Sequence, residues 1–122
     1  MIGYVTLGTN DLPRAVAFYD KLCAELGATR MIEMDTGVVW AANGVWPGLT
    51  LTKPFNKEPA TVGNGVMVGF KAKDHEQVRR LYEIALANGG SDEGAPGPRV
   101  QGFYAAYFRD PDGNKLNAFV MD

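Results

Sequence analysis

The chain has 122 residues and a mass of 13.2 kDa, a size that suits one compact domain or two half-sized modules sharing a core. Hydrophobic residues make up 46% and charged residues 21%, proportions that exclude a disordered chain, a collagen-like repeat and a membrane protein. Twelve Lys and Arg against 14 Asp and Glu give a net charge of -2 with no basic stripe, so we expect no nucleic acid partner.

The N-terminus and the cysteine content favour the cytoplasm. The chain opens on an apolar alternation over residues 1–5, without the charged segment, long apolar run and cleavage site of a secretory signal. A single cysteine, Cys23, excludes an intrachain disulfide and a thiolate metal cluster. We therefore expect a cytoplasmic protein with no membrane partner.

The first half of the chain predicts a strand, a helix and three further strands. Residues 2–7 alternate with period two, as a strand does. Asn10 and Asp11 offer N-cap oxygens to an amphipathic helix, and Gly27 is a suitable residue to end it. Turn-forming dipeptides then separate three extended stretches at 30–35, 38–42 and 49–53.

The second half repeats this order. Residues 66–70 predict a strand, Asp74 caps a helix with Gln77 in capping-box register, and glycines 89–90 end that helix. A Gly- and Pro-rich loop over 94–102 is expected to form a mobile flap. Two strands, at 103–108 and 115–120, then flank a turn at 110–114.

The two halves also align residue by residue, which indicates a duplication. A shift of 63 positions places Asp11 on Asp74 and Tyr19 on Tyr82. Near the module ends a shift of 65 positions fits better and places Leu51 on Leu116. Residues 55–65 contain Pro59 and directly follow Pro54, and they form the expected linker between the modules.

The chain resembles the vicinal oxygen chelate superfamily, which includes glyoxalase I, bleomycin-resistance proteins, fosfomycin-resistance transferases and extradiol dioxygenases. The resemblance lies in the tandem modules, the opening motif Gly3-Tyr4-Val5-Thr6-Leu7-Gly8-Thr9-Asn10-Asp11-Leu12 with Ala17-Phe18-Tyr19, and the turn Asp110-Pro111-Asp112-Gly113-Asn114. It implies an α+β fold in which two tandem βαβββ modules curl a mixed sheet around a central cavity. The single domain spans 1–122, with module one at 1–54, a linker at 55–65 and module two at 66–122.

The resemblance also assigns the positions of a metal site. Metal enzymes of this superfamily place His, Glu and sometimes Gln on the first and last strands of both modules, because a divalent ion needs such donors. The corresponding residues here are Tyr4, Thr52, Met67 and Asn117. None is a histidine or a carboxylate, so we expect a degenerate metal site with no bound metal and no cofactor.

Other residues are expected to line the cavity. Strand alternation gives Thr6 the same side as Tyr4, and gives an inward face to Trp40 and to either Tyr104 or Ala105. Arg99, in the glycine-rich loop, is a candidate to receive an anionic group. The candidate ligand-binding residues are therefore Tyr4, Thr6, Trp40, Thr52, Met67, Arg99, Tyr104 and Asn117, and no catalytic residue is assigned.

Three hypotheses of function follow. The first is a metal-free protein that binds a small molecule, similar to the bleomycin-resistance type. The alternative is a metal-dependent lyase or isomerase resembling glyoxalase I, or a dioxygenase-type enzyme of the same superfamily, and the third is a structural dimer module without a ligand. We expect a homodimer, because open curled sheets leave edges and apolar rims uncovered. The sequence leaves open the ligand and whether modules pair within or between chains.

Overall fold

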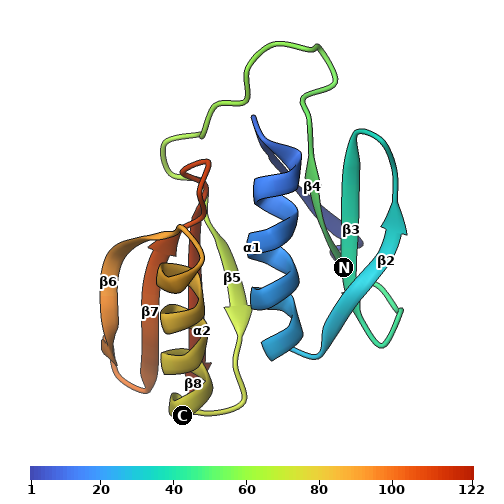
Figure 1. The fold of residues 1–122 in the computed structure, drawn as a ribbon. Helices are drawn as coiled ribbons and strands as arrows, with labels where there is room; N and C mark the ends of the chain where they lie inside the picture. Colours follow the sequence, from blue (N-terminus) through green and yellow to red (C-terminus); the bar gives the residue numbers. More distant parts are fainter.

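The computed structural model describes all 122 residues as two helices and eight strands (Figure 1). The first half contains β1 (Tyr4–Gly8), α1 (Leu12–Glu25), β2 (Ala28–Glu33), β3 (Gly37–Ala42) and β4 (Gly48–Thr52). The second half contains β5 (Val68–Lys71), α2 (His75–Ala87), β6 (Ser91–Pro98), β7 (Phe103–Arg109) and β8 (Lys115–Met121). Both halves therefore have the βαβββ order, which confirms the predicted fold class.

The two sheets have the same topology. Their strand orders are β1-β4-β3-β2 and β5-β8-β7-β6, and in each sheet the first strand pairs in parallel with the last. The remaining pairs are antiparallel. No strand of one sheet pairs with a strand of the other, so the sheets are not closed into a common barrel within the chain. The connection over 53–67 contains turns but no strand.

Both helices begin at the residues that the sequence predicts. The carboxylate of Asp11 accepts a hydrogen bond from the amide of Arg14 at 3.1 Å, and the carboxylate of Asp74 accepts one from the amide of Gln77 at 2.8 Å. These bonds satisfy amides that have no partner inside the first helical turn. Neither helix has the length and apolar composition needed to span a membrane.

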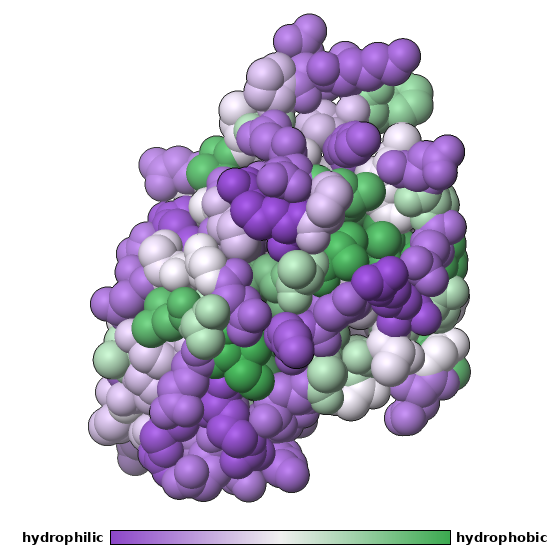
Figure 2. Space-filling view, in the orientation of Figure 1, coloured by the Kyte–Doolittle hydropathy of each residue, from purple (hydrophilic) through white to green (hydrophobic).

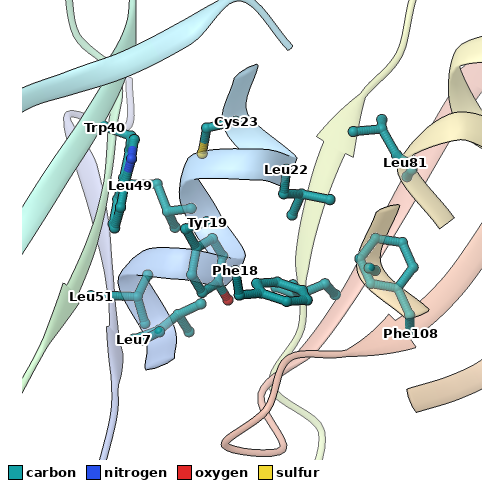
Figure 3. Close-up of a cluster of buried hydrophobic side chains, with 14 of the residues drawn as sticks. Leu7, Phe18, Tyr19, Leu22, Cys23, Trp40, Leu49, Leu51, Leu81 and Phe108 are labelled. Carbon is teal, nitrogen blue, oxygen red and sulfur yellow. The ribbon is translucent and has the colours of Figure 1, made fainter. Parts of the chain in front are cut away.

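One hydrophobic core runs through both modules. α1 packs on β2, β3 and β4, α2 packs on β6, β7 and β8, and the two helices pack against each other. Eighteen buried residues form a single cluster. Figure 3 shows α1 in the middle of this cluster, with Trp40, Leu49 and Leu51 on one side and Leu81 and Phe108 on the other. The modules therefore bury their helices together.

This packing leaves one face of each sheet without a helix. Because each helix covers one face of its own sheet and the helices contact each other, the covered faces turn inward and the uncovered faces turn away from each other. We call these uncovered surfaces the module-one face (Tyr4, Thr6, Thr50, Thr52 and their neighbours in register) and the module-two face (Met67, Gly69, Tyr107, Asn117 and their neighbours in register). Figure 2 shows that the side carrying the helices is largely hydrophilic, with separate apolar patches.

The predicted flap at 94–102 is wrong over most of its length, because Ser91–Pro98 forms strand β6. β6 is the edge strand of its sheet, where proline is tolerated since no further strand needs its amide. Its pairing with β7 shifts register between Asp92 and Gly94 and again between Gly94 and Gly97. A composition typical of a loop therefore belongs to an irregular edge strand.

The turn at 110–114 fastens module two to module one. The Oδ1 atom of Asp110 accepts hydrogen bonds from the backbone amides of Asp112 and Asn114, each at 2.9 Å. The Asn114 side chain donates to the carbonyl of Gly8 at 3.0 Å, and the Thr9 hydroxyl donates to Oδ2 of Asp112 at 2.6 Å. The motif that carries the family resemblance thus holds the two modules together.

Candidate functional site

The module-one face is uncharged. Its strands place three rows of residues side by side, and none of these residues is charged at neutral pH: Tyr4, Gly48, Ala41 and Thr29; Thr6, Thr50, Val39 and Ile32; Gly8, Thr52 and Gly37. Tyr4 is 63% exposed, and its ring lies 5.9 Å from that of Trp46. This face therefore offers hydroxyl groups, small residues and two exposed aromatic rings.

Thr52 lies at the far end of this face from Tyr4. Its hydroxyl donates to the backbone carbonyls of Thr36 at 3.1 Å and Lys53 at 3.0 Å. Thr52 also lines a cavity of about 730 Å³ beneath the segment 53–59. Tyr4 pairs with Gly48 and Thr52 pairs with Gly8, at opposite ends of the β1–β4 ladder, so the two side chains do not form one contact site.

The module-two face has an asparagine at its centre. Asn117 of β8 lies in register with Gly69 on one side and Tyr107 on the other. The residue is only 2% exposed, and its amide makes no hydrogen bond within the chain; because no buried side-chain polar atom of the chain lacks a partner, the amide reaches the surface of this face. A Cβ atom added to Gly69 would lie 2.5 Å from Oδ1 of Asn117, so the glycine leaves the space that the amide occupies.

Two other predicted residues lie on the same face as Asn117. Met67 lines a cavity of about 520 Å³ together with Tyr107 and Lys115. Arg99 places its guanidinium carbon 5.4 Å from the centre of the Tyr107 ring. Met67, Arg99 and Asn117 therefore lie around one tyrosine, Tyr107.

The predicted orientation of Trp40 is wrong. Trp40 is 1% exposed and lies on the covered face, where its ring is 5.7 Å from that of Tyr19 in α1. Its indole N–H donates to Oδ1 of Asp20 at 2.9 Å. The guanidinium of Arg30 beside Asp20, helped by this indole, holds the pKa of the Asp20 carboxyl below its usual value.

Of the two alternatives Tyr104 and Ala105, Tyr104 lies on the covered face. Its ring stacks on His75 of α2 at 3.9 Å between centroids, and its hydroxyl accepts a 2.8 Å hydrogen bond from Arg79. Ala105, the other candidate from the sequence, takes the module-two face and is fully buried. The aromatic residue packs against the cationic side of α2, and the small residue lies on the uncovered face.

The four metal-site positions divide between the two faces within one chain. Tyr4 and Thr52 lie on the module-one face, and Met67 and Asn117 lie on the module-two face. The register of the sheets also corrects one equivalence between the modules. The shift of 63 positions places Thr6 on Gly69. Thr6 pairs with Thr50 and Gly69 pairs with Asn117, so the counterpart of Asn117 is Thr50 and not Thr52. The two-residue error keeps the same face, because side chains on a strand repeat every second residue.

The residues present do not fit a divalent metal centre. The donors at the four positions are a phenol, a hydroxyl, a thioether and an amide, and nowhere in the chain do three His, Cys, Asp or Glu residues gather in a suitable group. Burial raises the pKa of the Cys23 thiol to about 12, so it is a neutral core residue. His75 contacts the carboxylate of Asp122 at 3.0 Å.

The family model of the glyoxalase/bleomycin resistance protein/dioxygenase superfamily matches residues 1–118. The chain belongs to this superfamily. A glyoxalase/bleomycin resistance protein from Albidiferax ferrireducens has 36% sequence identity and a TM-score of 0.92, with 100% of this chain and 99% of that chain covered. Membership of the glyoxalase superfamily confirms the resemblance found in the sequence.

More distant glyoxalase-like structures share the fold. A glyoxalase-related enzyme from Fulvimarina pelagi has 20% identity and a TM-score of 0.78, covering 98% of this chain and 87% of that chain. A lactoylglutathione lyase from Agrobacterium tumefaciens has 24% identity and a TM-score of 0.72, covering 98% of this chain and 92% of that chain. A comparison with curated proteins found no match.

Proposed function

We propose that the protein binds a small organic molecule on the module-two face without a metal ion. The observation that carries this proposal is the amide of Asn117, which reaches the surface at the centre of an uncovered face and makes no hydrogen bond within the chain, although the residue as a whole is only 2% exposed. A hydrogen bond between this amide and a ligand contributes about 0.5–1.5 kcal/mol. A ligand that accepts from the amide nitrogen or donates to its oxygen gains this free energy.

The surroundings of Asn117 suit a bound molecule. Tyr107, in register with it, faces the cavity of about 520 Å³ that Met67 also lines. Aromatic and thioether side chains supply apolar contact area, and a few polar groups then fix the orientation of the ligand. This combination supports the binding hypothesis over a purely structural module.

A second copy of the chain is proposed to complete the site. Large apolar side chains remain exposed on both uncovered faces, with Tyr4 at 63%, Trp46 at 53%, Met67 at 44% and Met121 at 62% exposure. Because the two faces of one chain point apart, we infer that modules pair between chains, with the module-one face of one copy against the module-two face of another. This arrangement makes a homodimer with two equivalent cavities.

The metal-dependent lyase or isomerase is disfavoured by the donor set described above, because no histidine or carboxylate occupies the four positions. A cytoplasmic location remains part of the proposal and is favoured by the single free cysteine.

The test is a screen of small organic molecules by thermal shift, followed by the variant Asn117→Leu. A specific ligand at a hundredfold excess over its dissociation constant should stabilise the protein by about 2.7 kcal/mol. Asn117→Leu should remove about 1–3 kcal/mol of that shift by deleting the amide. Asn88→Leu, at the end of α2 on the other side of the sheet, is the control and should leave the shift intact.

One result of this screen would contradict the binding proposal. If Asn117→Leu changes only the melting temperature of the free protein, and no compound produces a shift that this variant reduces, Asn117 is a core residue and the binding proposal is wrong.

A further inference from the structure

We propose that the ligand of the module-two face is an organic anion, whose acidic group is attracted by the positive charges of Arg99 and Lys115 and whose apolar part lies against the aromatic side chains of the same face. The inference rests on the proposed function and names the chemical class of its ligand. Charge, hydrogen bonding and the composition of the face support it independently.

Arg99 differs from every other arginine of the chain. Each of the other five contacts a carboxylate in an ion pair: Arg14, Arg30, Arg79, Arg80 and Arg109. Arg99 has no such partner, and its hydrogen bonds go to the neutral backbone carbonyls of Ala95 at 2.7 Å and Pro98 at 3.3 Å. Its positive charge is therefore held in place without being neutralised.

The edge strand β6 provides the surface on which Arg99 lies. Added Cβ atoms would lie 3.3 Å from a guanidinium nitrogen at Gly94 and 3.2 Å from one at Gly97. The absence of side chains at these positions lets the guanidinium lie close to the backbone and beside Tyr107. The glycines that gave β6 the composition of a loop thus make room for a positioned cation.

A second cation lies beside the same tyrosine. The Nζ atom of Lys115 is 5.7 Å from the centre of the Tyr107 ring, and this lysine forms no ion pair. Arg109 lies on the same face, but Glu93 contacts it at 2.5 Å and offsets its charge. Arg99 and Lys115 therefore lie on either side of the row that contains Asn117, and neither forms an ion pair with a carboxylate.

The charge of this face opposes that of the whole chain. Four cations, namely Lys71, Arg99, Arg109 and Lys115, lie on the module-two face with one carboxylate, Glu93, while the chain as a whole has a net charge of -2. A concentrated positive charge on an acidic protein favours an anionic ligand, since guanidinium and ammonium groups form charge-assisted hydrogen bonds with carboxylate, phosphate or sulfonate oxygens.

The same face also requires an apolar part in the ligand. The rings of Phe103 and Phe119 stack at 5.3 Å between centroids next to the row of Asn117, and Met67 lies at the other end. A free inorganic anion would leave these side chains uncovered. An aromatic or branched acid contacts the cations, the amide of Asn117 and the apolar side chains together.

The experiment compares two probes of one shape, 2-naphthoate and its neutral amide 2-naphthamide, by isothermal titration calorimetry at low and high salt. We expect 2-naphthoate to bind the native protein at least about tenfold more tightly at low salt, and high salt should reduce this preference. Arg99→Met and Lys115→Met should each weaken 2-naphthoate binding by about fivefold to tenfold and leave 2-naphthamide unchanged. Lys21→Met, on the exposed side of α1, removes the same charge and should change neither.

The outcomes separate the inference from the function on which it rests. Equal affinity for the two probes, or equal effects of Lys115→Met and Lys21→Met, would overturn the anionic class and leave small-molecule binding standing. Failure of both probes to bind would overturn both. Circular dichroism of each variant confirms folding, and both methionine substitutions remove exposed or half-buried charges rather than core side chains.

Discussion

The hydroxyl of Tyr19 in α1 donates a 2.6 Å hydrogen bond to Oδ2 of Asp110, which lies 91 residues later in the turn before β8. Both residues are buried, Tyr19 completely and Asp110 to within 3%. Burial, and after it the charge of Asp110, raises the pKa of the Tyr19 phenol well above its usual value, so the hydroxyl stays protonated and remains a donor. One side chain of module one thus anchors the turn that characterises module two.

Removing this hydroxyl should destabilise the whole chain. We expect Tyr19→Phe to lower the free energy of unfolding by about 1.5–3 kcal/mol, because it deletes a buried hydrogen bond to a charged group. Urea denaturation checks the value. Tyr82→Phe is the matched control, since its hydroxyl bonds Asp92 at 2.9 Å in an exposed position, and its cost should be smaller. Equal losses in the two variants would contradict the anchoring role of Tyr19.

The contact between the helices should weaken in acid. Arg80 donates to Glu25 at 2.7 Å, and this bond, with a further one from Gln77, holds the pKa of the Glu25 carboxyl below its usual 4.5. A carboxyl whose pKa is lower in the folded state stabilises the fold above its unfolded pKa and loses that effect as the pH falls through the folded value.

Glu25→Gln should therefore reduce stability at neutral pH and flatten its decline below about pH 4.5, near the unfolded pKa of a glutamate. Thermal unfolding measured from pH 7 to pH 3 tests this expectation. Glu58→Gln, in the linker and without an ion pair, is the control and should leave the pH profile unchanged. A native-like acid decline in Glu25→Gln would contradict it.

Chelators should not change the stability of the protein. The donor set on the two faces predicts that protein purified without chelator contains no stoichiometric Zn, Ni, Mn or Fe, and that EDTA leaves the melting temperature unchanged. A bound metal would otherwise stabilise the folded state by mass action. Elemental analysis and thermal unfolding measure the two quantities, and a one-to-one metal content would refute the degenerate site.

The protein should be a homodimer in which the uncovered faces meet. Thr6→Lys places a charge on the uncharged module-one face and should shift sedimentation at micromolar concentration towards the monomer. Ala87→Lys, exposed at the end of α2 on the covered side, should leave the assembly intact. Trp46, half-exposed on the module-one face, should show red-shifted emission in Thr6→Lys. A native protein that sediments as a monomer would exclude the dimer.

The order of the elements follows from the sequence because its local signals are strong. Asp11 and Asp74 are N-caps, and glycines follow both helices, so the duplicated pattern predicts both modules. The orientation of Trp40 could not be predicted from alternation, since residues 37–41 of β3 are all small or apolar and all are buried. β7 poses the same difficulty, because apolar side chains on both faces hide which one meets α2.

Two other features could not be predicted from the sequence. β6 and the turn after it are longer than β2 and the turn after it, so a single shift of 65 residues places Thr52 opposite Asn117 where the register places Thr50. Tyr107 and Lys115 share the face of Asn117 by strand period, and that signal was present. The sequence does not show that Arg99 lies beside Tyr107, because the position of Arg99 depends on the irregular pairing of β6 with β7.

The inward packing of the helices has a consequence for how such a chain changes over time. The module-one rows and the Asn117 row lie outside the single core of 18 residues, on the sheet faces that no helix covers. The exposed residues among them, such as Tyr4 and Thr6, are therefore less constrained by folding stability than residues on the covered faces. After a duplication, two copies of one ancestral surface can diverge separately on a shared scaffold. Here the module-one face is neutral and bears hydroxyl groups, and the module-two face carries positive charge.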